Sequence, residues 1–370
     1  MTDRDPANIA IDYSTSPSRV APGGGMLHWM AIATACATFP LIFMGGLVTS
    51  HQAGMSVPDW PNSYGYNMFL FPPRLWIGGI LYEHTHRLMG TVVGLCSIGL
   101  VIASFTSTWA GRRERWLAAA VLGAVIFQGV LGGLRVVLVQ LDLAIVHACV
   151  AQAFFCLAAY VAVETSVWWQ NRKPASIEDQ ARGHRLVMLG VATVLAIYVQ
   201  LIVGATMRHF QAGLAIPDLP LAYGKVLPPI NSAQLDAANW VRTRDLNLEP
   251  VTLGQIWLHF GHRIGAVVVT LLILALATMV VRRYAGEAKL RRPALLLFAL
   301  IAIQLTLGVL TVLMRKPADI ASAHVAVGAL VLVTAFVLTA RSARLYGWLP
   351  RTSEREDEFA VRALQPARAG

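Results

Sequence analysis

The chain has 370 residues, of which 56% are hydrophobic and only 14% are charged. Soluble domains carry about 25% charged residues, so the composition excludes an ordinary water-soluble enzyme. The formal charge of +10 suggests nucleic-acid binding, but the basic residues gather between long apolar blocks. That distribution indicates membrane topology and excludes a nucleic-acid partner.

Eight apolar stretches are long enough to cross a membrane as helices, which requires about 20 residues for a hydrocarbon core of roughly 30 Å. Strands of a membrane barrel are about ten residues long and alternate in polarity, and these stretches do neither. They cover residues 27–48, 79–105, 116–137, 143–164, 185–207, 254–281, 293–314 and 321–341. The sequence therefore predicts an all-α membrane protein with eight transmembrane helices.

The positive charges are distributed unevenly about these stretches. Of the 30 lysines and arginines, 20 lie on the side that holds both termini. The positive-inside rule predicts that this side is cytoplasmic, with residues 1–26 and 342–370 as cytoplasmic tails. All four cysteines fall inside apolar stretches without a C-x-x-C pattern, so neither a disulfide framework nor a thiolate metal site is expected.

The second half of the chain repeats the first. Residues 52–59 reappear at 211–218, an offset of 159, and the His-Arg pair at 86–87 reappears at 262–263, an offset of 176. Each unit contains four stretches, an even number, so both units cross the membrane in the same direction. We therefore predict two tandem parallel four-helix bundles, residues 27–164 and 185–341, joined by a cytoplasmic linker at 165–184.

Four histidines recur in matching places. His86 and His147 of the first unit correspond to His262 and His324 of the second, and all four lie near the outer ends of their stretches. Two inward-pointing imidazoles from packed helices are typical of axial ligands of a heme iron. The alternatives are polar contacts between helices and a zinc site, although two histidines without a carboxylate or cysteine make a poor zinc site.

The residues beside these histidines complete the candidate site. Arg87 and Arg263 directly follow a ligand, and an arginine at the membrane edge can bind a heme propionate; interface snorkelling is the alternative. Glu83 precedes His86 by three residues, which places both on one helical face, whereas the second copy has His259 there. This difference predicts that one half performs chemistry and the other supports it.

Three further features are weaker. Gln128 and Gln304 repeat among glycines and favour hydrogen bonding between close helices. Arg135 is a second candidate for binding a propionate. The two long outer loops, which contain the repeated Pro-Asp pairs, are predicted to lie as lids over the hemes.

The ordered motifs resemble the heme A synthase family over nearly the whole chain apart from the tails. The resemblance rests on residues 46–49 and 53–60, the E-x-x-H-R and H-x-x-H-R blocks at 83–87 and 259–263, His147 and His324. It implies oxidation of a ring methyl of heme O to a formyl group through a hydroxymethyl intermediate, heme I. It also implies that Glu83 is catalytic. Some bacterial members carry a cysteine pair in an outer loop, which this chain lacks.

By the same resemblance, His86 and His147 bind the substrate heme O, and His262 and His324 bind a heme b cofactor. The implied setting is a bacterial inner membrane, with heme O synthase as a possible supplier, a terminal oxidase as the recipient and an unidentified electron donor. A diheme b-type electron-transfer protein requires the same four histidines and is the main alternative. A duplicated transporter is the alternative without heme.

Overall fold

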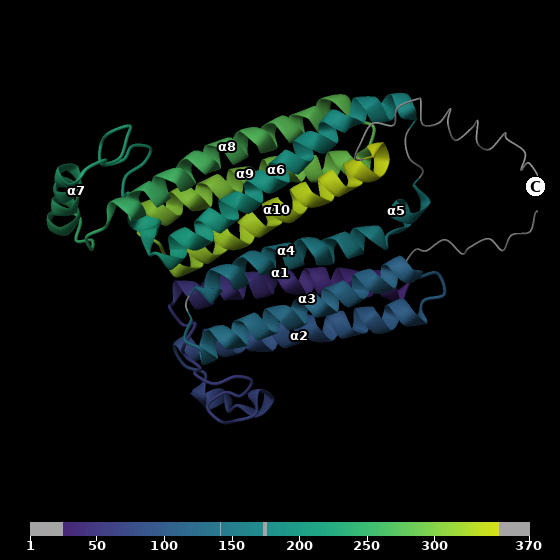
Figure 1. Cartoon of the computed structure of the whole chain (residues 1–370), viewed down its shortest axis with the longest axis horizontal. Helices are drawn as coiled ribbons and strands as arrows, with labels where there is room; N and C mark the ends of the chain where they lie inside the picture. The colour runs from purple at the N-terminus through teal and green to yellow at the C-terminus, as the bar shows by residue number, and fades with distance from the viewer. Residues whose placement is uncertain (1–24, 141, 173–175, 348–370) are drawn as a thin grey trace, which may run out of the picture.

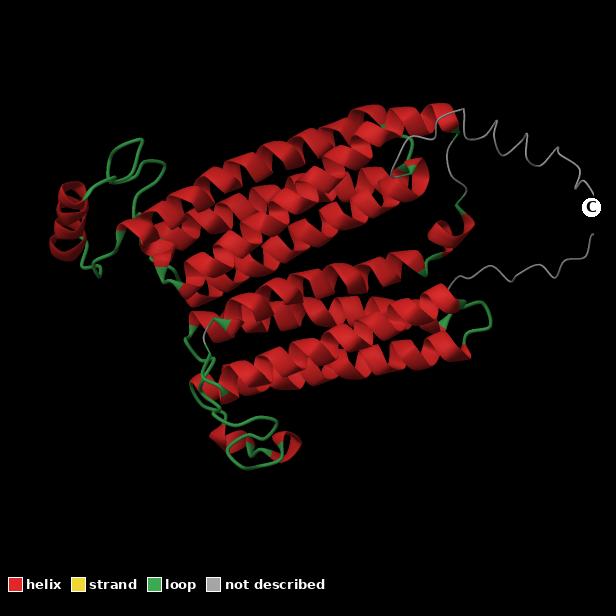
Figure 2. Ribbon diagram, in the orientation of Figure 1, coloured by secondary structure: helices red, strands yellow, loops and turns green. Residues whose placement is uncertain are grey.

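A computed structural model of the chain describes residues 25–140, 142–172 and 176–347, so the predicted tails lie almost wholly outside the described residues. Eight of its helices are long and apolar enough to cross a membrane, which confirms the predicted all-α membrane fold (Figure 2). They are α1 (Met26–Ser50), α2 (Gly79–Thr106), α3 (Arg112–Val137), α4 (Leu143–Glu164), α6 (Ile177–His209), α8 (Leu253–Arg283), α9 (Ala288–Leu313) and α10 (Ala318–Tyr346).

Several helices extend beyond the apolar stretches that predicted them. Helix α3 begins at Arg112, where the Glu114 carboxylate accepts the backbone N–H of Gly111, and α10 continues to Tyr346. In the predicted linker, the short helix α5 (Val167–Asn171) is followed by the start of α6 at Ile177. Hydropathy detects only the part of a helix that lies in lipid, whereas charged turns can continue the same helix into water.

The spans pack in two groups of four (Figure 1). In the first group, α1 and α3 each contact both α2 and α4. In the second group, α6 and α9 each contact both α8 and α10. The groups meet where α10 packs against α1 and α4, and where α4 packs against α6. Helix α10 therefore belongs to one group while packing against the other, and one apolar cluster joins Ile42 and Phe155 to residues of the second group.

Helix α10 is the most enclosed span, and it packs against α1, α4, α6 and α9. In the apolar stretch of α10 that is long enough to cross a membrane, 44% of the residues are buried, compared with 22% in the corresponding stretch of α9. Small residues such as Ala326, Gly328 and Ala329 line its buried surface, and small side chains let membrane helices approach closely. A Cβ added at Gly46 of α1 would lie 3.1 Å from Cβ of Ser322, so the contact between the halves is tight.

The outer loops begin with the same local structure in both halves. Asp59 accepts the backbone N–H groups of Tyr64 and Gly65, and Asp218 accepts those of Tyr223 and Gly224 in the same way. Both tyrosines have a positive φ, and each hydroxyl donates to a backbone carbonyl eight residues earlier. The duplication therefore extends to the hydrogen bonds of the loops.

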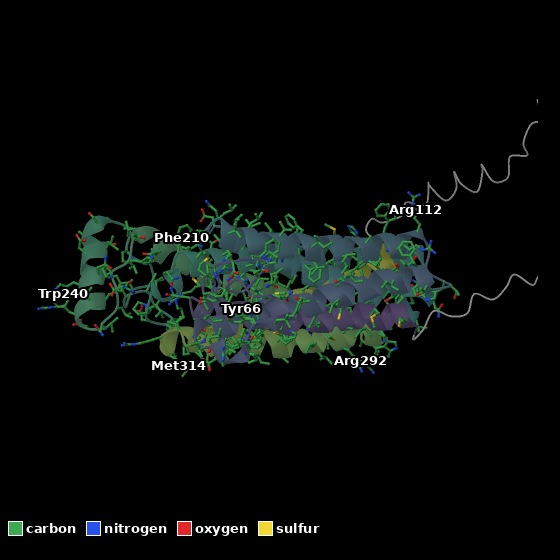
Figure 3. The ribbon with its side chains drawn as sticks, turned by 90° about the horizontal axis from the view of Figure 1, so that it is seen from below. Tyr66, Arg112, Phe210, Trp240, Arg292 and Met314 are labelled. Carbon is green, nitrogen blue, oxygen red and sulfur yellow. The ribbon has the colours of Figure 1, made fainter. Side chains whose placement is uncertain are left out.

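The loops then diverge. The first continues through two short 3-10 helices, η1 (Met68–Leu70) and η2 (Pro73–Leu75). The second contains η3 (Ala212–Leu214) and the helix α7 (Ser232–Arg244). Because α7 is polar, the search for apolar stretches in the sequence did not predict it. Figure 3 shows Trp240 of α7 at the end of the molecule opposite to Arg112 and Arg292.

Candidate heme-binding sites

The four repeated histidines come from the helices that the sequence assigned to them. His86 lies on α2 and His147 on α4, while His262 lies on α8 and His324 on α10. Each lies within the third of its helix next to the outer loops. Both pairs are therefore at the same end of the molecule, one in each half.

The first pair has the spacing that two axial ligands require. The ring centroids of His86 and His147 are 6.5 Å apart, and their planes are inclined by 77°. A metal–imidazole bond is about 2.0–2.1 Å long, and the bonding nitrogen lies roughly 1 Å from its ring centroid. Two imidazoles on one iron therefore have centroids roughly 6 Å apart, and the observed separation fits one iron between them.

The second pair is flanked by side-chain amides. Gln200 Nε2 lies 3.0 Å from Nδ1 of His262, and Gln304 Nε2 lies 3.4 Å from Nε2 of His324. No cluster of three or more histidine, cysteine, aspartate or glutamate side chains occurs in the described part of the chain. Structural zinc uses four such ligands and catalytic zinc three, whereas a heme iron takes two from the protein, so the donor set fits heme.

Each of the four imidazoles lies against a glycine of the neighbouring helix. A Cβ built on the glycine would lie 3.1–3.4 Å from Cε1 of the histidine. The pairs are Gly45 with His86, Gly132 with His147, Gly204 with His262, and Gly308 with His324. Gly45 and Gly204 are 159 residues apart, and Gly132 and Gly308 are 176 apart. The repeat therefore preserves the glycine that faces each histidine ring as well as the histidine itself. The sequence analysis did not identify this role of the glycines.

The absence of a side chain brings each ring close to the partner backbone. Nδ1 of His86, His147 and His324 is buried and has no hydrogen-bond partner among the described residues. An Nδ1 that carries the proton leaves Nε2 available to bind a metal, although Nε2 of His324 lies 3.4 Å from the Gln304 amide. His262 differs from the other three histidines, because its Nδ1 lies 3.0 Å from the side-chain amide nitrogen of Gln200. The sequence analysis did not identify Gln200 as a site residue.

Glu83 and Arg87 together hold the first outer loop. The buried Glu83 carboxylate accepts the N–H of Val57 at 2.9 Å and pairs with Arg87 at 2.8 Å. Arg87 also donates to the carbonyls of Val57, Asp59 and Asn62. The two residues therefore fasten residues 57–62 to α2, one turn from His86.

The second half repeats this clamp with an imidazole in place of the carboxylate. His259 Nδ1 accepts the N–H of Ile216 at 3.1 Å, so Nε2 of the neutral ring carries the proton. Nε of Arg263 lies 3.3 Å from that nitrogen. Arg263 donates to the carbonyls of Ile216 and Leu221. Glu83 and His259 therefore make equivalent contacts, in both cases with the loop residue that follows the repeated Gly54 or Gly213 by three positions.

Two other arginines lie near the histidine pairs. Arg135 of α3, three residues after the glycine that faces His147, donates to the Gly54 carbonyl at 2.6 Å. Arg208 of α6, four residues after the glycine that faces His262, donates to the Gly46 carbonyl and to Ser50 Oγ. Arg208 was not among the predicted site residues because nothing corresponds to it in the first copy.

The remaining repeated or polar residues have structural contacts. Gln128 donates to the His147 carbonyl at 3.1 Å. His84 is fully buried between the rings of Phe71 and Trp76, with Ser63 as its polar partner. His51 stacks on Tyr82, His28 hydrogen-bonds to Thr165, and His209 pairs with Asp142.

Comparison with known proteins places these features in a family. The profile of the COX15-CtaA family, described as cytochrome oxidase assembly proteins, matches residues 79–337. A heme A synthase of Chelativorans sp. (strain BNC1) is 28% identical over 87% of this chain and 93% of its own length. Those of Rhodopseudomonas palustris and Shewanella oneidensis are 27% and 24% identical, over 85% and 83% of this chain and 89% and 94% of their own lengths. With its duplicated spans, its histidine pairs and a match over most of its length, the chain belongs to the COX15-CtaA family of cytochrome oxidase assembly proteins.

Proposed function

We propose that the protein is a heme A synthase, which oxidises a ring methyl of heme O to a formyl group through the hydroxymethyl intermediate heme I. The observation that carries the proposal is the pair His86 and His147, whose centroids are 6.5 Å apart in the half that also carries Glu83. Oxidation of a methyl group needs redox chemistry that side chains do not provide, and a heme held by these histidines would supply it.

We assign the substrate heme O to His86 and His147, and a heme b cofactor to His262 and His324. The assignment is supported by the family resemblance and by the one chemical difference between the two clamps, Glu83 against His259. In each half the protein would supply two axial nitrogens, the glycine that orients each ring, and a loop fastened beside the site.

The arginines are proposed to bind heme propionates. Arg87 uses four of its five N–H donors on the loop and on Glu83, which leaves only Nε–H. Arg263 uses two on the carbonyls of Leu221 and Ile216 and keeps three. Arg135, which lies near both histidines of the first pair, is the further cation available there.

We propose that Glu83 holds or moves a proton, or stabilises positive charge that develops beside the substrate. Both of its oxygens are hydrogen-bonded, so proton transfer requires one of these bonds to open. Glu83→Gln keeps the shape and one acceptor oxygen, and should retain the bound heme while losing conversion to heme A. Normal conversion by this variant would exclude Glu83 from the chemistry.

Analysis of the pigment tests the proposed reaction against a diheme electron-transfer function. Mass spectrometry of the extracted hemes should find heme O, heme I or heme A in the purified protein, and heme A should accumulate when heme O is supplied by co-expressed heme O synthase. Unmodified heme b alone, at two per chain, would favour electron transfer. Colourless protein would contradict both functions and favour transport.

We propose the bacterial inner membrane as the location, with both termini in the cytoplasm, the heme sites near the outer face, and terminal oxidase assembly as the destination of the product. The proposal is supported by the 20 basic residues at the end that carries the termini. A reporter that is active only in the cytoplasm should be active when fused after Gly370 and inactive when inserted in the loop around Asn231.

A further inference from the structure

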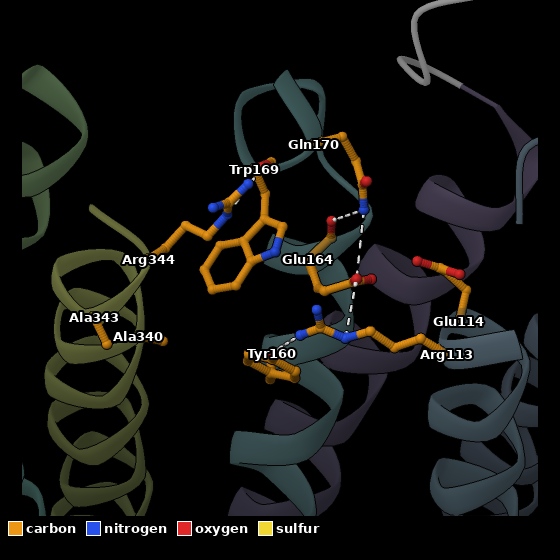
Figure 4. Close-up of a pocket in the computed structure, with 9 residues that line it drawn as sticks. All are labelled: Arg113, Glu114, Tyr160, Glu164, Trp169, Gln170, Ala340, Ala343 and Arg344. Atoms are coloured by element: carbon orange, nitrogen blue, oxygen red, sulfur yellow. Dashed lines mark hydrogen bonds and ion pairs between the residues drawn. The ribbon is translucent and has the colours of Figure 1, made fainter. Parts of the chain in front are cut away.

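A cavity of about 420 Å³ lies at the end of the molecule opposite to the histidines. It is bounded by the ends of α3 and α4, by the short helix α5, and by α10 of the other half (Figure 4). Its lining residues are Arg113, Glu114, Tyr160, Glu164, Trp169, Gln170, Ala340, Ala343 and Arg344. The heme chemistry proposed above uses none of them.

Glu164 places a buried carboxylate on this cavity. The residue is only 1% exposed. Its Oε1 lies 3.4 Å from the side-chain amide of Gln170 and 3.7 Å from Nε of Arg113. Its Oε2 is buried and has no hydrogen-bond partner within the described structure. A buried carboxylate oxygen without a partner is unusual, so Oε2 of Glu164 is available to a hydrogen-bond donor from outside the protein.

The opposite wall supplies positive charge. Arg344 donates from Nε to the Trp169 carbonyl and lies 5.8 Å from the centre of the Trp169 ring, while its two terminal nitrogens make no hydrogen bond with any described residue. Arg113 donates to the Tyr160 hydroxyl, and Glu114 caps its own helix. Two guanidinium groups and two carboxylates make the lining neutral overall, with separated charges.

The cavity lies at the level where lipid head groups are expected. It is lined by Trp169 of α5, and tryptophans gather at the membrane–water interface. Figure 1 shows the two halves diverging toward this end, where α5 lies. In a bilayer, space between helices at this depth is accessible to phospholipids.

We propose that this cavity binds the head group of a phospholipid that carries a primary ammonium beside its phosphate, of the phosphatidylethanolamine class. The ammonium donates to Oε2 of Glu164, and the phosphate accepts hydrogen bonds from the terminal nitrogens of Arg344. A choline head group has the positive charge but no N–H donor. A glycerol head group has no positive charge and brings a net negative charge to a neutral site.

The test is lipid retention by the full-length protein, measured by native mass spectrometry after addition of phosphatidylethanolamine, phosphatidylcholine or phosphatidylglycerol with identical acyl chains. We expect phosphatidylethanolamine to be retained about tenfold more strongly than either of the others, because one charge-assisted hydrogen bond separates them. Equal retention of all three, or strongest retention of phosphatidylglycerol, would overturn the proposal.

Two variants and a control assign the contacts. Glu164→Gln should abolish the preference for phosphatidylethanolamine over phosphatidylcholine, and Arg344→Gln should weaken retention of both. Arg112→Gln removes a neighbouring arginine that does not line the cavity and should change nothing. Monodispersity and thermal unfolding establish whether each variant is folded. If one of the two variants does not fold, lipid retention by the other still tests the proposal. A folded Glu164→Gln or Arg344→Gln protein with unchanged lipid selectivity and retention would contradict the assignment.

Discussion

Replacing Gly308 by alanine tests whether the glycines set the positions of the histidine rings. A Cβ at this position would lie 3.1 Å from Cε1 of His324, whereas carbon atoms in ordinary contact are about 3.5–4.0 Å apart. The ring, or the α9 backbone, must therefore move by roughly half an ångström. Metal sites tolerate deviations of only about 0.2 Å in ligand distance, so the imidazole should no longer hold its iron as before.

The size of the effect follows from the same contact. Inserting a methyl group into a packed interior typically costs about 1–3 kcal/mol, and about 1.4 kcal/mol corresponds to a factor of ten in binding. We therefore expect heme in the second half to be retained about tenfold or more weakly. The remaining heme should show partial loss of the low-spin signal of two axial imidazoles, as measured by visible absorption and electron paramagnetic resonance.

Gly261 provides the matched control. It directly precedes the predicted ligand His262 in sequence, yet a Cβ there would meet nothing within 4 Å. Gly261→Ala should keep the heme spectrum and gain up to about 1 kcal/mol of helix stability. If Gly308→Ala leaves heme content and spin state unchanged, or if Gly261→Ala disturbs them equally, the ring-positioning argument is wrong.

Three other perturbations follow from the contacts of the sites and loops. His147→Ala should remove bis-imidazole ligation in the first half alone and His324→Ala in the second alone, so heme spectra of the two variants should differ; identical spectra would contradict separate sites. Arg87→Lys loses the multiple loop contacts that a planar guanidinium makes and should destabilise the first loop by about 1–3 kcal/mol, seen as faster proteolytic cleavage between α1 and α2. Burial raises the pKa of Asp59. The hydrogen bonds from Gly65 and Tyr64 and the charge of Arg87 together lower it by more, so the pKa of Asp59 is below its ordinary value. Its contribution to loop stability is therefore complete above the unfolded-state pKa and is lost as pH falls through the lower folded-state pKa, and Asp59→Asn should remove this acid-induced increase in cleavage.

The sequence alone predicted the spans and the site residues because both depend on patterns that repeat along the chain. Eight apolar stretches gave eight helices, since a bilayer core requires about 20 apolar residues per crossing whatever the tertiary contacts. The offsets of 176, from His86 to His262, and 177, from His147 to His324, identified the matching histidines without any knowledge of their contacts. Offsets of 159 and 176 connect the four glycines, but a glycine among many others carries no chemical signal of its own.

The loop contacts of Glu83 and His259 could not be predicted from the sequence. The difference between these two residues predicted divided chemistry, and that remains a prediction, whereas the structure reveals a shared contact: each accepts the N–H of a loop residue and lies beside the arginine one turn later. Hydrogen bonds between a helix and a distant loop depend on how the loop folds back, and no periodicity of the helix records that.

What the sequence determined by itself was the membrane class, the duplication and the four histidines, because hydrophobic length and repeat offsets are properties of the chain. Only the tertiary structure decided that His86 and His147 lie 6.5 Å apart, that glycines face all four rings, and that Glu164 of one half shares a cavity with Arg344 of the other. These are contacts between helices far apart in sequence, and they are set by the rotation and tilt with which the helices pack.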